Sequence, residues 1–343
     1  MKSRLLGGLT AREFLRRHWQ KRPLFVRAAL PQLEGVLDYR ALCALAARDD
    51  VESRIVERRG GRWKTAHGPF GKVMPKKRNF TILVSGVNLQ VAAAERLLRR
   101  FAFVPQARLD DVMVSFATPG GGVGPHIDSY DVFLLQGPGH RRWRVGNRVY
   151  LAAPGDLLYV PPGWRHDGVA VDRCFTYSIG FRAPRGTELG AAFLDFLHER
   201  GLPDATYRDP GLAPTRRPAA IPPEMIRFSA KIIKKIRWSG ADVQRFLGEF
   251  LTMPKAHVVF KPGRSTRALS GSRVRLDPAT QLLYSGTRFF INGETARVAA
   301  RNAAALRELA DRRSAPGARL AGPALAGLIS GWQRLGYLHL ERP

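Results

Sequence analysis

The sequence of 343 residues contains only two cysteines, Cys43 and Cys174. This scarcity excludes a disulfide framework and a zinc site built from cysteine ligands, and it fits a reducing compartment. No run of about 18 apolar residues occurs, so we expect no membrane span. The N-terminus lacks the apolar stretch of a secretory signal. These absences together predict a cytoplasmic protein.

Acidic residues are also scarce, because 28 Asp and Glu stand against 56 Lys and Arg, a net charge of +28. A charge of this size attracts anionic partners such as RNA, a ribonucleoprotein or DNA. The arginines are spread along the chain, so a solvated basic surface without a partner explains the charge as well. The hydrophobic fraction of 45% argues against a disordered chain. The length suggests two or three domains.

Short β-rich runs separated by Gly/Pro turns fill residues 51–183 and predict a sandwich or barrel. The runs are Val112–Phe116, Asp131–Gln136, Arg142–Val145, Asp156–Val160 and Phe175–Phe181. Residues 9–48 are expected to be helical, with Thr10 as the N-cap and Pro23 as the stop. A further amphipathic helix is expected over residues 89–101.

The last 140 or so residues have a different composition. Six prolines in residues 201–223 indicate a linker. A helix follows over residues 224–251, with a break at Gly240, and it packs either on its own domain or on a second copy of the chain. The order of predicted elements after residue 256 is compatible with a winged helix. These elements are strands at 274–276, 281–284 and 288–291, helices at 294–311 and 322–335, and a closing strand at 337–340.

Two histidines and one aspartate form the strongest chemical signal. His126 and Asp128 follow a glycine-rich stretch and are two residues apart, so on a strand their side chains point to the same side. His166 comes 38 residues after Asp128, just beyond a rigid Pro-Pro-Gly turn that can hold a ligand at a barrel mouth. Two histidines and one carboxylate leave coordination positions open, as in non-haem Fe(II) oxygenases. The alternative is that these are unrelated surface histidines.

A 2-oxoglutarate cosubstrate needs a cation deep in such a barrel, and arginine binds carboxylates in a bidentate manner. The run from His140 to Val145 supplies three arginines on a predicted strand. Alternation places Arg141 with Trp143 on one face and Arg142 with Arg144 on the other. Periodicity does not decide which face points inward.

Several segments together resemble the bacterial ribosomal oxygenases, which are JmjC-type, cupin-fold 2-oxoglutarate oxygenases. The segments are residues 121–137, 141–145, 157–163, 166–168 and 177–184, and the early stretch 14–24. The resemblance implies an α+β fold, a double-stranded β-helix barrel followed by a helical dimerisation region and a C-terminal winged-helix-like module. The implied domains are residues 1–200, 201–255 and 256–343.

By this resemblance His126, Asp128 and His166 are iron ligands, and Arg141 holds the carboxylate of 2-oxoglutarate. Ser178 and Ser115 are weaker candidates for polar contacts with the cosubstrate, and core-facing strand serines are an equal alternative.

Tyr130 and Asp131 lie just beyond the metal motif, and we expect them to contact the substrate, since a carboxylate suits a guanidinium. The alternatives are barrel packing for Tyr130 and a salt bridge to a nearby arginine for Asp131.

The resemblance implies an enzyme that hydroxylates C3 of an arginine side chain in a large-subunit ribosomal protein. Its cofactors are then Fe(II), 2-oxoglutarate and O₂, and its partners are that substrate and a second copy of the chain. A nucleic-acid partner is possible but not required. Alternatives are a ribosomal-protein histidine hydroxylase, another JmjC hydroxylase or demethylase, and a basic nucleic-acid-binding module.

Overall fold

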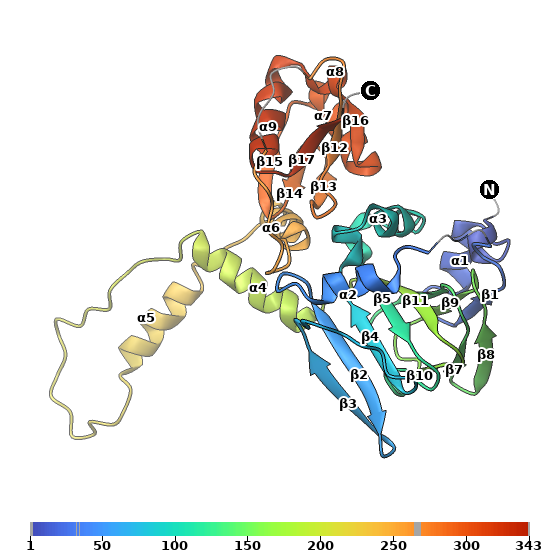
Figure 1. Ribbon diagram of the computed structural model, residues 1–343. Coiled ribbons are helices and arrows are strands. Elements are labelled where there is room, and N and C mark those ends of the chain that lie inside the picture. The colour runs from blue at the N-terminus through green and yellow to red at the C-terminus, as the bar shows by residue number, and fades with distance from the viewer. Residues whose placement is uncertain (1–2, 32, 34, 264–268, 342–343) are drawn as a thin grey trace. The chain divides into compact units, whose positions relative to one another are not determined.

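The computed structural model describes residues 3–31, 33, 35–263 and 269–341. It divides into two compact units, shown with their elements in Figure 1. The first unit comprises Met1–Ala183, Pro254–Gln281 and Ala300–Pro343, and the second comprises Pro184–Met253 and Leu282–Ala299. Among the described residues, no helix combines the length and the apolar character needed to cross a membrane.

The N-terminal part forms helices where the capping signals lie, but it is less helical than predicted. Helix α1 (Ala11–Arg17) begins at a capping box, in which the Glu13 amide donates to the Thr10 hydroxyl and the Glu13 carboxylate accepts from the Thr10 amide. The region expected to be one helical stretch is interrupted by strand β1 (Leu24–Val26), so that expectation was wrong there. The other elements are α2 (Tyr39–Ala46), α3 (Ala92–Arg99), η1 (Arg4–Leu6), η2 (Val87–Leu89) and η3 (Gln106–Arg108).

The centre of the first unit is a barrel of two antiparallel sheets. The eight-stranded sheet has the order β1, β9 (Leu157–Val160), β6 (Val132–Gln136), β11 (Cys174–Phe181), β5 (Leu109–Ala117), β4 (Phe80–Val84), β2 (Ser53–Arg59) and β3 (Arg62–His67). The smaller sheet has the order β10 (His166–Ala170), β7 (Arg141–Val145) and β8 (Arg148–Ala152). The five predicted β-runs coincide with β5, β6, β7, β9 and β11, which confirms the barrel expectation.

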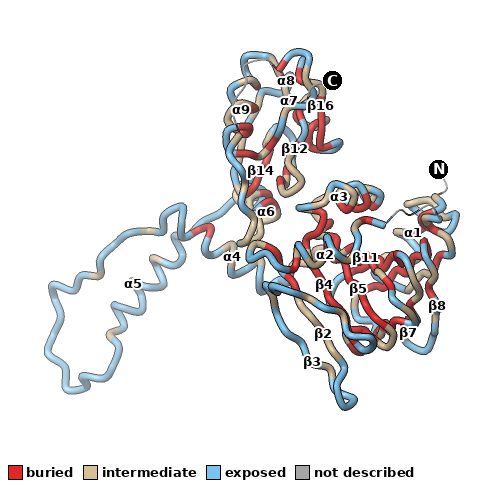
Figure 2. Tube along the Cα trace, viewed as in Figure 1, coloured by how far each residue is buried: buried red, intermediate tan, exposed pale blue. Residues whose placement is uncertain are grey.

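Strand alternation gives the large sheet two apolar faces. One face, which includes Phe133 and Tyr177, packs in a core with residues of the N-terminal helices such as Phe14. The opposite face, which includes Leu134, packs against Trp143 of the smaller sheet. Figure 2 shows buried residues along the barrel strands. The sheet is therefore covered on one side by helices, and its other side forms the barrel interior.

The barrel strands β2, β3, β4, β8 and β10 were not among the predicted runs. Arg54 and Arg58 on β2, with Lys64 on β3, obscure the alternation of apolar residues from which a strand is normally identified. The turn between β2 and β3 does carry a signal, because Gly60 and Gly61 both have positive φ (56° and 78°), as a two-residue type I′ hairpin turn requires.

Helices dominate the first part of the second unit. They are α4 (Gly186–Glu199), α5 (Pro223–Ile233) and α6 (Gly240–Thr252). The predicted break at Gly240 is confirmed, because α6 begins at this residue and the Ser239 side chain caps it. Helix α6 packs on a hairpin sheet so closely that a Cβ on Gly248 would lie 2.3 Å from the Phe290 ring.

The C-terminal residues form two three-stranded sheets and short helices. One sheet, in the first unit, comprises β16 (Ser314–Pro316), β12 (Arg273–Leu276) and β17 (Leu338–Glu341), and the other, in the second unit, comprises β13 (Leu282–Ser285), β14 (Arg288–Ile291) and β15 (Glu294–Arg297). The helices are α7 (Ala300–Arg312), α8 (Gly317–Leu320) and α9 (Pro323–Arg334). The helix expected from residue 294 begins only at Ala300, because residues 294–297 pair with β14 instead. Tertiary pairing overrides helix propensity there.

Candidate metal centre

His126, Asp128 and His166 converge at one end of the barrel. Each offers one ligand atom, and these atoms all lie within 4.8 Å of one another. The Nε2 atom of His126 is 3.9 Å from Asp128 Oδ1, and the Nε2 atom of His166 is 3.6 Å from Asp128 Oδ2. Two imidazoles and a carboxylate on one side of a common centre match the donor set of a non-haem Fe(II) site.

The glycine-rich stretch before His126 runs beside β10, the strand that carries His166. Gly120 donates to the carbonyl of Ala170, and Ala170 donates to the carbonyl of Gly121, both at 2.8 Å. A Cβ on Gly122 would lie 2.4 Å from the Gly168 carbonyl oxygen, so glycine permits this close approach of two backbones. The glycines therefore allow the segment to reach the candidate ligands without a side chain in the way.

Both histidine rings are oriented by main-chain carbonyls. Nδ1 of His126 lies 2.9 Å from the Gly124 carbonyl oxygen, and Nδ1 of His166 lies 3.0 Å from the Trp164 carbonyl oxygen. A carbonyl only accepts, so in each ring Nδ1 carries the proton and the Nε2 lone pair points to the common centre. Burial lowers the pKa of His166, and the neighbouring His126 lowers it further, which favours the neutral, ligating form.

The structure resolves which face of β7 points inward. Arg141, Trp143 and Val145 are buried, whereas Arg142 and Arg144 are exposed. The Arg141 guanidinium lies 5.6 Å from the Trp143 ring, and that ring lies 6.2 Å from the ring of His166. The three groups thus follow one another along the inner face.

Arg141 is a buried cation with few hydrogen-bond partners. It is 3% exposed; among the described residues, Nη2 donates only to the Cys174 sulfur at 3.8 Å and Nε has no hydrogen-bond partner. A buried guanidinium without an anion is costly. The residues present therefore fit a carboxylate ligand between the metal centre and Arg141, as a 2-oxoglutarate cosubstrate provides.

Ser115 and Ser178 lie on the same inner surface of the large sheet. Ser115 pairs across the strands with Thr176, and Ser178 follows Thr176 by two residues on β11. Both serines are buried, and the Ser115 hydroxyl is 3.5 Å from the Thr176 carbonyl oxygen. Their positions are compatible with polar contacts inside the barrel.

Tyr130 and Asp131 point to different environments, as expected for neighbours on a chain entering strand β6. Tyr130 is 41% exposed. Partial burial raises the pKa of Tyr130 to about 12, and the charge of the neighbouring Asp128 contributes. Tyr130 therefore lies beside the candidate ligand Asp128 with a hydroxyl that stays protonated.

Asp131, in contrast, is fully buried and its carboxylate is occupied. It accepts hydrogen bonds from Tyr159 at 2.6 Å and Gln20 at 3.1 Å, and it forms an ion pair with Arg108 at 3.3 Å. The geometry favours the salt-bridge alternative over substrate contact. The carboxylate joins the N-terminal segment to the barrel wall.

Two further residues on the inner surface have buried polar atoms that find no hydrogen-bond partner in the described part of the chain, and sequence reasoning missed both. They are Thr81, whose Oγ1 is buried, and Arg54, whose Nε is buried. Thr81 pairs with Ala117, which pairs with Cys174 beside Arg141, and Arg54 pairs with the residue two positions after Thr81, so these residues share a face. Only identification of β2 and β4 as strands would have pointed to them.

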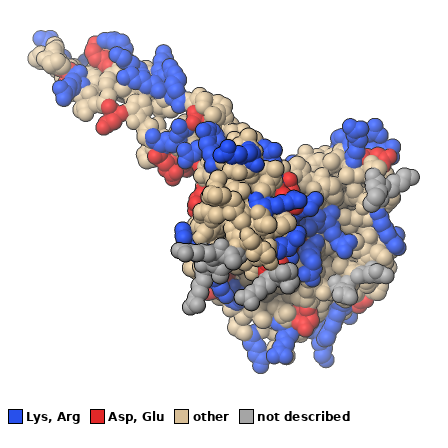
Figure 3. Space-filling view, turned by 90° about the horizontal axis from the view of Figure 1, so that it is seen from above, with Lys and Arg blue, Asp and Glu red and all other residues tan. Residues whose placement is uncertain are grey.

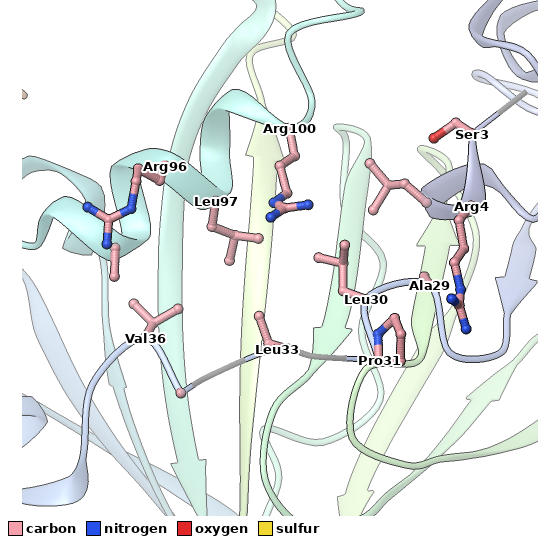
Figure 4. Close-up of a pocket in the computed structure, with 13 residues that line it drawn as sticks. Ser3, Arg4, Ala29, Leu30, Pro31, Leu33, Val36, Arg96, Leu97 and Arg100 are labelled. Carbon is pink, nitrogen blue, oxygen red and sulfur yellow. The ribbon is translucent and has the colours of Figure 1, made fainter. Parts of the chain in front are cut away.

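A separate hollow of about 640 Å³ lies between the N-terminal segment and α3 (Figure 4). Leu30, Leu33 and Leu97 line it, and Arg100 points into it. None of the three metal-ligand candidates lines this hollow.

Figure 3 shows lysine and arginine side chains distributed over the visible face of the molecule, with fewer acidic groups among them.

Comparisons with known proteins agree with this geometry. The JmjC domain model matches residues 96–153 and 150–189, and the ROXA-like winged helix model matches residues 235–339. The fold and the His-Asp-His cluster thus define a protein with a JmjC domain of the cupin fold.

Named relatives narrow the class. The chain is 35% identical over 274 residues to the ribosomal protein uL16 3-hydroxylase of Escherichia coli strain K12, covering 73% of each chain. It is 36% identical over 210 residues to a probable ribosomal oxygenase of Haemophilus influenzae, covering 53% of this chain and 52% of the relative. The structure of YcfD, a ribosomal oxygenase from Escherichia coli, in complex with cobalt and 2-oxoglutarate, superimposes with a TM-score of 0.84 at 31% identity, covering 97% of this chain and 98% of that one. The chain belongs to the ribosomal oxygenase family.

Proposed function

We propose that this chain hydroxylates an arginine side chain, at C3, in a large-subunit ribosomal protein, with Fe(II), 2-oxoglutarate and O₂. The observation that carries the proposal is the pairing of a His-Asp-His cluster with a buried, unpaired arginine on one inner barrel surface. The similarity to a uL16 3-hydroxylase and to a structure that holds cobalt and 2-oxoglutarate supports it.

Each proposed role follows from position. His126, Asp128 and His166 hold the metal, and Arg141 binds the far carboxylate of the cosubstrate as a charge-assisted pair. Ser115 and Ser178 are proposed to add polar contacts to that carboxylate. When bound, the iron and 2-oxoglutarate supply the oxidising chemistry that places one oxygen atom of O₂ on a substrate carbon.

The protein's own contribution is orientation. Main-chain carbonyls fix the two imidazoles with Nε2 toward the metal, so no rearrangement of the rings is needed on binding. Tyr130, exposed beside Asp128, is proposed to donate a hydrogen bond from its hydroxyl to a main-chain or side-chain acceptor of the incoming peptide. The half-exposed rim formed by His126 and Tyr130 is where the peptide reaches the metal.

The decisive experiment incubates the purified protein with Fe(II), 2-oxoglutarate, ascorbate and peptides from large-subunit ribosomal proteins. We expect a mass gain of one oxygen atom on an arginine, and its loss in Asp128→Ala. Gly186→Ala, which adds a methyl group in open space on α4, is the matched control and should retain activity. Oxygen on a histidine, or loss of a methyl group from a lysine, would contradict the proposal.

We further propose a cytoplasmic homodimer in which residues 201–255 form the dimerisation region, between a catalytic domain at 1–200 and a winged-helix-like domain at 256–343. Helix α5 has no buried residue, and Ile226 and Ile233 on it are 56% and 65% exposed. An apolar helix surface of this kind is typical of a contact between proteins.

Sedimentation velocity tests the dimer. We expect the double variant Ile226→Glu, Ile233→Glu to sediment as a monomer, and Lys231→Glu on the same helix to remain dimeric. A monomeric unmodified protein at micromolar concentration would contradict this proposal.

A further inference from the structure

Residues 53–79, which we name the basic arm, concentrate positive charge in one part of the first unit. The arm comprises strands β2 and β3 and the segment that leads to β4. It contains nine lysine or arginine residues and one acidic residue, a net charge of +8 in 27 residues. Figure 1 shows β2 and β3 extending as a two-stranded ribbon beyond the other strands of the barrel.

The charges on the arm are available to a partner. The one acidic residue, Glu57, is already bound by Arg59 and by Lys76. Burial alone would raise the pKa of Glu57, but these two cations hold it below its usual value. The remaining cations on the outer part of the arm are exposed and have no acidic partner among the described residues. They are Arg58, Arg62, Lys64, Lys72, Lys77 and Arg78.

The arm adjoins the metal centre. The Arg58 guanidinium lies over the ring of Trp63 at 5.6 Å, across the β2–β3 pair. That ring packs so closely on Gly124 that a Cβ there would lie 2.7 Å from it. Gly124 also supplies the carbonyl that orients His126. Arg58 and Trp63 share the face of the ribbon that adjoins the rim, whereas Arg62 and Lys64 lie on the opposite face. The arm therefore offers cations on both faces, and a polyanion bound along it reaches the rim where a substrate enters at the Arg58 face.

Protection of a sheet edge does not explain the whole arm. Strand β3 is an edge strand, and positive side chains on an edge discourage pairing with another chain. However, Lys72, Lys77 and Arg78 lie outside any strand. Their charges have no edge to protect, so a ligand is the better explanation for the concentration of cations in the arm.

We propose that the basic arm binds the phosphate backbone of RNA. The preference for RNA over another polyanion rests on the proposed function, because a ribosomal protein substrate is accompanied by ribosomal RNA and is itself an RNA-binding, hence basic, protein. The arm would repel such a protein and attract its RNA. Exposed arginines beside an aromatic ring are also typical of surfaces that bind single strands. The arm thus holds the enzyme on a ribonucleoprotein while the barrel receives the peptide.

The test measures binding of a fluorescein-labelled single-stranded RNA of about 15 nucleotides, long enough for a site of this size, by fluorescence anisotropy across a salt series. The arm variant is Arg62→Gln, Lys64→Gln, Lys77→Gln. The matched control is Arg208→Gln, Arg216→Gln, Arg217→Gln, which removes the same charge from exposed positions outside the arm. Thermal unfolding and Co(II) binding of each variant show that the fold is intact.

We expect the arm variant to bind RNA at least ~10-fold more weakly, with the slope of log affinity against log salt smaller by about 2 for three lost phosphate contacts. The control should bind within ~2-fold of the unmodified protein. Equal losses in both variants, or no RNA binding by the unmodified protein, would overturn the proposal. A polyglutamate peptide that bound with the same affinity and the same dependence on the arm would assign the surface to an acidic protein instead.

The two proposals fail separately. Hydroxylation of a free peptide needs the metal centre but not the arm, so the arm variant should hydroxylate that peptide at the normal rate. RNA binding without peptide hydroxylation would leave the arm assignment in place and remove the proposed function.

Discussion

His126 and His166 exchange both hydrogen bonds of an antiparallel β-bridge. The His126 amide donates to the His166 carbonyl at 3.0 Å, and the His166 amide donates to the His126 carbonyl at 2.9 Å. Directly hydrogen-bonded pairs have a fixed separation of Cα atoms. The distance between these two proposed ligands is therefore set by the main chain, and their ring centroids lie 4.2 Å apart.

Gly168→Ala should weaken metal binding without unfolding the protein. A Cβ at this position, two residues after His166, would lie 2.4 Å from the Trp143 ring. Either that ring or strand β10 must move, and displaced support for a ligand typically costs at least ~10-fold in metal affinity. Co(II) titration by visible absorption measures the effect, with Gly186→Ala as the control. Unchanged affinity in Gly168→Ala would show that β10 does not set the ligand position.

Arg141→Met should raise the KM for 2-oxoglutarate by ~10- to 100-fold, because it removes the proposed charge-assisted bond to the cosubstrate. The same change should raise the melting temperature of the metal-free protein, since a buried cation without an anion is replaced by an apolar side chain of similar length. Arg141→Lys should keep part of the affinity but lose bidentate binding. A lower melting temperature in Arg141→Met would indicate that Arg141 is a structural group and not a ligand-binding one.

Asp131→Asn should destabilise the fold and leave substrate binding unchanged. The variant removes the ion pair with Arg108 and replaces one acceptor oxygen by a donor facing Tyr159 or Gln20, at a cost of ~1–3 kcal/mol. Chemical unfolding measures the cost, and the KM for the peptide is the second readout. An increased peptide KM with normal stability would restore Asp131 to the substrate site.

The first turn of helix α6 should unfold in acid only at a pH below the range in which an aspartate is usually protonated. Hydrogen bonds from the Ser239 backbone and side chain, and from Arg200, lower the pKa of Asp242 to about 2 from an ordinary 3.8. Because the folded-state pKa is depressed, this stabilisation is complete above about pH 4 and is lost as the pH falls toward 2.

NMR titration of the Asp242 carboxyl carbon gives the midpoint directly. In Asp242→Asn the amide signals of the first turn of α6 should no longer change over this pH range. A midpoint near 4 in the unmodified protein would show that the capping box does not form in solution.

The sequence predicted five of the barrel strands, although it missed the apolar strand β4, and it predicted the proposed ligands that come from short motifs. The turn before His166 is indicated by Pro161, Pro162 and Gly163. A close approach of two backbones is indicated by the glycines before His126. Strands β2 and β3 remained hidden because their exposed sites carry charge, so the periodic signal is absent. Their Gly60-Gly61 turn was the remaining clue.

Which face of a strand becomes buried depends on the assembled fold and not on the sequence of the strand alone. Arg141 and Arg142 are equivalent in the sequence, and only the packing of β7 against the large sheet makes Arg141 the buried one. Asp131 illustrates the same limit, since its partners Gln20, Arg108 and Tyr159 come from distant parts of the chain. Residues 294–297 show the same dependence for secondary structure, because they pair with strand β14 instead of forming a helix.

The groups that orient both imidazoles are peptide oxygens, of Gly124 and Trp164. In many metalloproteins a carboxylate side chain has this task, and a single codon change can delete it. A peptide oxygen is not removed by a change of the side chain at its own position. Loss of ring orientation here therefore requires movement of the main chain, which a side chain at Trp164 need not cause but a side chain at Gly124 would, since its Cβ would lie 2.7 Å from the Trp63 ring.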